Sequence, residues 1–182
     1  MKYIYLRVFF AFFFFFHQTQ AQIGGWDPKA EEKARETIQA FQEKDAELKE
    51  FFSQAYGYVV FPSVGKAAIG LGGAHGKGTL FQSGRVIGSA KMTQVTIGFQ
   101  LGGQSYAEVI FFEDAASLDD FKSGDLEFAA QASAVAADIG ASADVAYQNG
   151  VAVFTMANGG LMYEASIGGQ KFKYIPNKKI AD

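Results

Sequence analysis

The sequence predicts an α+β protein with a long N-terminal amphipathic helix packed on a twisted, mostly antiparallel β-sheet or partial barrel. Between residues 28 and 53, apolar residues recur at the three- and four-residue spacing of an amphipathic helix. From Tyr58 onward, apolar and β-branched residues form short runs separated by glycine-rich and Asn-Gly turn signals. An apolar content of 49% provides enough hydrophobic surface for a core between the two layers.

Residues 1–21 have the pattern of a secretory signal peptide. Lys2 and Arg7 form a positive n-region, residues 8–16 are a nine-residue apolar core, and 19–21 (Thr-Gln-Ala) place small residues at a cleavage site. The apolar run is shorter than the roughly 20 residues that span a bilayer, although an uncleaved anchor is the alternative. We therefore expect an exported protein, periplasmic or secreted, with residues 22–27 as a flexible lead.

The composition excludes several classes of function. Removing residues 1–21 leaves 14 Lys and Arg against 19 Asp and Glu, so the formal net charge changes from −3 to −5. A net acidic domain argues against a nucleic acid partner, because phosphate binding normally needs a basic face. The absence of cysteine excludes disulfides, thiol catalysis and cysteine metal sites.

The predicted helix covers residues 28–53. Asp27 is its expected N-cap and Pro28 its first residue. This helix could lie on a membrane surface or pack against the rest of the domain. Five basic and seven acidic residues within it make the polar face negative, which favours packing. The expected buried stripe consists of Ala34, Ile38, Phe41, Leu48 and Phe52.

Residues 56–176 are predicted to be rich in β-structure. Ser83-Gly84 is a turn signal, and Asn149-Gly150 predicts a hairpin between residues 145–147 and 151–156. Residues 114–121 predict one short helix that Asp114 caps. The other expected strands are at 58–60, 64–71, 80–81, 85–100, 108–112, 161–167 and 171–175, followed by a polar tail at 177–182.

The glycine-rich stretch 59–80 predicts short strands joined by tight turns, and it does not fit a nucleotide site. A P-loop requires Ser or Thr after Gly-Lys, but Gly78 follows Lys77. A dinucleotide fingerprint that starts at Gly70 requires glycine at 75, where the chain has His75. Both nucleotide motifs are therefore excluded.

Five motifs follow one another in a characteristic order between about residues 55 and 174. They are Phe61-Pro62 with Lys66 to Gly70 and the glycines up to Gly78, Ile97 to Gln104, Val109 to Phe112, Ala132 to Gly140, and Gly159 to Gly169. Together they resemble the SYLF domain, a lipid-binding family, and 28–176 is the expected single SYLF-like domain.

The resemblance implies affinity for anionic phospholipids or phosphoinositides. It also favours a strand over a helix for the alanine-rich residues 128–139, which have high helix propensity. The chain departs from the eukaryotic members at residues 84–92, where GRVIGSAKM replaces a Trp-Ser-x-Pro segment. This departure and the acidic charge fit bulk phospholipid, or another envelope component, better than phosphoinositides.

No catalytic constellation emerges from the residues. After the signal peptide, His75 is the sole histidine, and no G-x-S-x-G nucleophile motif occurs. Glu164 lies among apolar residues and could be a partly buried carboxylate, although an outward-facing glutamate is the better interpretation. We therefore expect a non-enzymatic protein without a cofactor or a metal.

Basic residues beside aromatic residues form the candidate lipid-binding site. Lysines in such a position meet lipid headgroups, whereas an ordinary edge strand protected by lysine is the alternative. The predicted function is anionic phospholipid binding at the membrane surface of the cell envelope. The alternative is a structural envelope protein that self-associates or binds a protein partner. The candidate residues are Lys171, Phe172, Lys173, Tyr174, Lys178 and Lys179, with Lys66 and Lys77.

Overall fold

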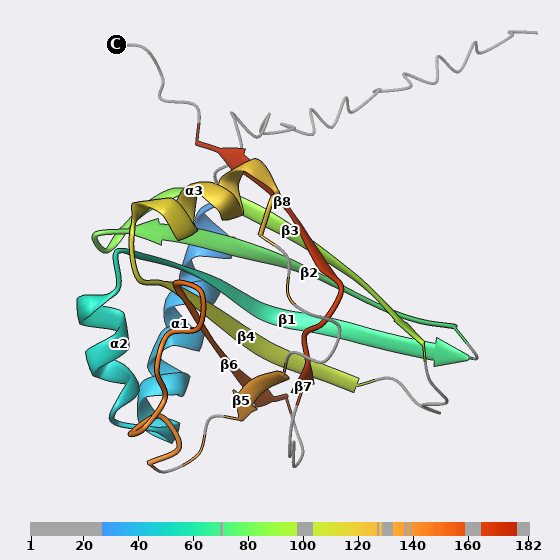
Figure 1. Ribbon diagram of the computed structural model, residues 1–182, viewed down its shortest axis with the longest axis horizontal. Coiled ribbons are helices and arrows are strands. Elements are labelled where there is room, and N and C mark those ends of the chain that lie inside the picture. The colour runs from blue at the N-terminus through green and yellow to red at the C-terminus, as the bar shows by residue number, and fades with distance from the viewer. Residues whose placement is uncertain are drawn as a thin grey trace, which may run out of the picture.

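The computed structural model describes residues 27–69, 71–97, 104–126, 128, 133–136, 138, 140–158 and 165–177. The predicted signal peptide, most of the flexible lead and most of the polar tail lie outside these residues. Within them the fold is α+β, with helices on a mostly antiparallel sheet (Figure 1). In the part of the chain that is described, no helix is both long and apolar enough to cross a membrane.

Two helices replace the single helix predicted over residues 28–53. They are α1 (Pro28–Lys44) and α2 (Leu48–Gln54), and Asp27 caps α1 by accepting a hydrogen bond from Lys29 N–H. The prediction of one continuous helix was wrong at Asp45, whose backbone is extended (φ −140°). The buried Asp45 carboxylate accepts hydrogen bonds from the backbone N–H and the hydroxyl of Ser142, at 2.9 and 2.7 Å. This distant partner ends α1 early.

The sheet has eight strands in the order β7-β5-β6-β4-β1-β2-β3-β8, and it does not close on itself (Figure 1). Every pair is antiparallel except β5 with β6. The antiparallel architecture is therefore as predicted. The strands are β1 (Gly57–Ile69), β2 (Leu71–Gln82), β3 (Arg85–Ile97), β4 (Gln104–Phe112), β5 (Ser133–Ala136), β6 (Val151–Ala157), β7 (Ala165–Ser166) and β8 (Gln170–Pro176).

The two faces of the sheet carry separate hydrophobic clusters. One cluster joins Phe41 of α1 and Leu48 of α2 to strand residues such as Val60 and Phe111. The other joins Leu118 and Phe121 of α3 (Ala115–Ser123) to the opposite face. In Figure 1, α1 accordingly lies behind the strands and α3 in front of them. As predicted, Asp114 caps α3, and hydrogen bonding to Ser117 lowers the pKa of its carboxyl.

The structure corrects two predictions about loops and strands. The glycine-rich stretch does not form short strands joined by turns, because its glycines after residue 70 lie within the continuous strand β2. Asn149 and Gly150 both adopt positive φ, at 52° and 76°, as the turn requires. However, residues 145–147 form no strand, and β6 pairs with β4 and β5 instead. Strand β5 confirms the extended interpretation for four of the alanine-rich residues.

Close packing explains one of the strand glycines. A Cβ built on Gly78 would lie 2.7 Å from two ring carbons of Phe61 and 2.9 Å from the carbonyl oxygen of Val60. A Cβ on Gly73 of the same strand would meet Gln94 O at an ordinary 3.6 Å. Glycine at 78 is therefore required by the approach of β1, whereas glycine at 73 is not.

We expect Gly78→Ala to destabilise the domain by about 2 kcal/mol, because overfilling a packed core forces side chains and backbone apart. Gly73→Ala is the matched control on the same strand and is expected to change the free energy of unfolding by less than about 0.5 kcal/mol. Urea denaturation followed by circular dichroism measures both. Equal stability of the two variants would contradict this packing argument.

Candidate functional site

Five basic side chains gather on one face of strands β2, β3 and β8, and we call them the lysine face. The residues Lys77, Lys91 and Lys173 lie directly opposite one another in register across the three strands. In the next row, His75, Thr93 and Lys171 are paired in the same way. All six side chains are exposed. Because neighbouring strands lie about 4.8 Å apart, the four lysine ammonium groups form a compact positive array.

Helix α1 covers this face of the sheet only as far as Thr79. The hydroxyl of Thr79 donates a hydrogen bond to the carbonyl of Ala30 in α1 at 3.4 Å, and Thr79 is buried. Lys77, two residues further along the same face of β2, is exposed. The lysine face therefore begins just beyond the N-terminal end of α1.

The strands that carry the lysine face contain no acidic residue. Neither residues 51–107 nor residues 165–181 include an Asp or a Glu. Like charges placed directly opposite one another in a sheet destabilise it by repulsion. In an acidic protein, three lysines in one cross-strand row are thus an unfavourable arrangement that an anionic partner would relieve. Val95, 68% exposed, adds an apolar side chain to this face, two residues beyond Thr93.

Strand β8 is held by its inward-facing residues. Phe172 is buried, and its ring lies 5.1 Å from that of Phe121 and 6.1 Å from that of Phe61. The half-buried Tyr174 donates a hydrogen bond from its hydroxyl to Ile87 O at 3.0 Å, and burial raises the pKa of its phenol. Lysines therefore face solvent and aromatic rings face the core, as the alternation in the sequence predicts.

The structure brings together some of the predicted site residues and not others. Lys77, Lys171 and Lys173 share the lysine face. Lys66 is paired with Ala74 between β1 and β2, and its side chain is outside the described part, as are Lys178 and Lys179. Sequence reasoning missed Lys91 and did not assign His75 to the binding surface. The alternation within 85–97 could have identified Lys91 as outward-facing, but only the strand register places it between Lys77 and Lys173.

A buried polar cluster lies on the opposite face of the sheet. Glu108 of β4 is fully buried, and it accepts a hydrogen bond from the side-chain amide of Gln170 on β8 at 3.0 Å. Three strands separate β4 from β8, so this contact requires the sheet to curl strongly. Burial, followed by the charge of Glu108, raises the pKa of nearby Tyr106. Sequence analysis had singled out Glu164, which lies outside the described residues.

Comparison with known proteins agrees with the resemblance found in the sequence. Residues 93–176 match the family model Ysc84, described as "Las17-binding protein actin regulator". The chain is also 32% identical over 138 residues to Beta cell expansion factor A of Aeromonas veronii. That alignment covers 74% of this chain and 51% of the relative, so the chain spans about half the length of the curated relative it matches. The chain carries a domain of the Ysc84, or SYLF, family, which is matched over residues 93–176.

Proposed function

We propose that this protein is a non-enzymatic, exported domain that binds anionic phospholipid surfaces through its lysine face. The observation that carries the proposal is the cross-strand row of Lys77, Lys91 and Lys173 on strands without any acidic residue. Each lysine near an anionic bilayer contributes about 1 kcal/mol, and a flat row lets all three approach the surface together. The exposed Val95 would meet the boundary between headgroups and acyl chains.

Burial divides the candidate residues into two roles. Phe172 and Tyr174 support β8 from inside, and Lys171 and Lys173 provide the contacts with lipid headgroups. Lys178 and Lys179, which follow β8 in the sequence, would add to the same positive charge. Export fits this proposal, because the sequence pattern of residues 1–21 predicts delivery of the domain to an envelope membrane.

Vesicle flotation of residues 22–182 tests this function. We expect the protein to float with vesicles that contain 30% phosphatidylglycerol at low salt, and to remain at the bottom with vesicles of phosphatidylcholine alone. Because the Debye length falls from roughly 30 Å at 0.01 M salt to 3 Å at 1 M, binding should be lost at high salt. Absence of flotation under all conditions, or equal flotation with both vesicle types, would contradict electrostatic lipid binding.

A protein partner is the second candidate function. The description of the matching family names a protein that it binds, so a protein-binding or self-associating envelope component is consistent with family membership. Flotation separates this candidate from the first one, because a purely protein-binding domain would stay unbound to vesicles of either composition.

A further inference from the structure

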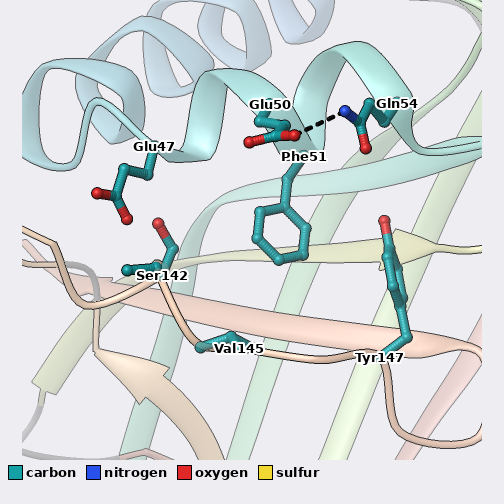
Figure 2. A pocket seen from close by; sticks show the side chains of 8 residues that line it. Glu47, Glu50, Phe51, Gln54, Ser142, Val145 and Tyr147 are labelled. Carbon is teal, nitrogen blue, oxygen red and sulfur yellow. Dashed lines mark hydrogen bonds between the residues drawn. The ribbon is translucent and has the colours of Figure 1, made fainter.

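A groove lies between α2 and residues 142–147. Its volume of about 530 Å³ is in the range of ligand-binding sites. In Figure 2, Phe51 points from α2 toward residues 142–147, and Tyr147 stands on the opposite wall. The lining residues are Glu47, Glu50, Phe51, Gln54, Ser142, Ala143, Val145 and Tyr147.

Both walls of the groove are fixed by buried contacts. The Asp45 carboxylate joins them, because it accepts hydrogen bonds from Glu47 N–H at the start of α2 and from Ser142 on the other wall. On the α2 side, the Phe51 ring packs 5.3 Å from Phe111 and 5.1 Å from Phe154. The groove therefore exists before any ligand binds, which lowers the entropic cost of binding.

The chemistry of the lining fits an organic cation. The rings of Phe51 and Tyr147 lie 5.7 Å apart at a 49° angle, and they form an aromatic surface inside the groove. Glu47, the N-cap of α2, and Glu50 in its first turn carry exposed carboxylates three residues apart, and Glu50 also accepts a hydrogen bond from the Gln54 side-chain amide at 2.7 Å. Among the residues that the structure describes, none that lines the groove is basic. A carboxylate pair beside aromatic rings attracts a cation by ion pairing and by cation–π interaction together.

The geometry points to a guanidinium group as the occupant, and we propose that the groove binds an arginine side chain from a basic segment of a partner protein. A planar guanidinium stacks on an aromatic ring while its N–H groups donate to carboxylates, which a compact ammonium does less well. The half-buried Tyr147 would remain a neutral phenol at physiological pH, because burial and the charge of Glu113 raise its pKa to about 12.

Charge argues for a protein segment rather than a lipid headgroup. Near the groove, residues 43–54 hold four acidic and two basic residues, and the exposed Asp144 adds a further negative charge. An anionic bilayer is therefore repelled from this end of the fold, whereas a soluble basic segment is attracted. This inference does not depend on lipid binding by the lysine face.

Titration of the ¹⁵N-labelled domain with the peptide acetyl-Gly-Arg-Gly-amide tests the proposal. We expect saturable NMR shift changes at the amides of residues 47–54 and 142–147, with a dissociation constant on the order of millimolar. The same peptide with neutral citrulline in place of arginine is expected to bind at least about fivefold more weakly, because it lacks the charge. Equal shifts with both peptides, or none at these amides, would overturn the proposal.

Two double variants test whether Glu47 and Glu50 bind the arginine side chain. Glu47→Gln with Glu50→Gln should weaken arginine binding roughly five- to tenfold, because two ion pairs are lost while the shape of the groove is kept. Glu32→Gln with Glu36→Gln removes the same charge from exposed positions of α1 and should leave binding unchanged. If both double variants weakened arginine binding equally, net charge would explain the effect and the proposed site would be refuted. Binding to phosphatidylcholine vesicles that requires Glu47 and Glu50 would assign the groove to a lipid headgroup instead.

Discussion

Replacing Lys77, Lys91 and Lys173 together with glutamine is expected to weaken binding to anionic vesicles by about two orders of magnitude at low salt. The three lysines form one cross-strand row, so a flat membrane can meet all of them at once. At about 1 kcal/mol for each lysine, their loss amounts to about 3 kcal/mol. Flotation or sedimentation at a series of lipid concentrations gives the partition coefficients to compare.

The folded state should not suffer from this change. Like charges directly opposite one another repel, so the glutamine row should leave the melting temperature equal to or slightly above that of the parent protein. A loss of binding by this variant can therefore be attributed to the surface and not to unfolding.

The matched control replaces Lys44, Lys49 and Lys122, at the C-terminal end of α1, on α2 and on α3, with glutamine. It has the same net charge as the first variant, and we expect its partition coefficient to change less than about threefold, because exposed charges far from the contact are screened. If both triple variants lost binding equally, net charge and not the lysine face would control the interaction. If the first variant bound vesicles as tightly as the parent protein, the binding site would instead be at Lys66, Lys178 and Lys179.

Local sequence patterns predicted those parts of the fold that local chemistry determines. The alternation of lysine and aromatic residues in 171–174 gave the correct inward and outward faces of β8, because side chains alternate along any strand. Asp114 marked the start of α3, since its carboxylate satisfies backbone N–H groups within three residues. The Ser83-Gly84 turn was also predicted from the local sequence, and both residues have positive φ.

Features that depend on distant partners could not be predicted in this way. The break after α1 depends on Ser142, which lies 97 residues from Asp45 in the sequence. The helical periodicity continues through 45–47, so the sequence near the break does not reveal it. The buried Glu108 likewise has its partner Gln170 62 residues away, on the edge strand of a curled sheet. The lysine face combines three strands, and only their register shows that Lys91 completes it.

The second large effect is expected from Phe41→Ala in α1. Phe41 is fully buried in the cluster that also contains Val60 and Phe111 of the sheet. Truncation of a buried phenylalanine typically costs about 3 to 5 kcal/mol, because it removes hydrophobic burial and leaves a cavity. For a domain of this size, a loss of about 3 kcal/mol lowers the melting temperature by roughly 6 to 12 °C.

Gln39→Ala, on the exposed side of the same helix, is the control for Phe41→Ala and should change stability by less than about 0.5 kcal/mol. Thermal unfolding in the absence of lipid decides between the two roles considered for this helix. If α1 served only to contact a membrane, the soluble domain would melt at the same temperature with Phe41 or with Ala at this position. A large decrease in melting temperature for Phe41→Ala alone would instead identify α1 as part of the core. The apolar residues of this helix would then stabilise the fold, and the lysine face would be the surface that contacts the membrane.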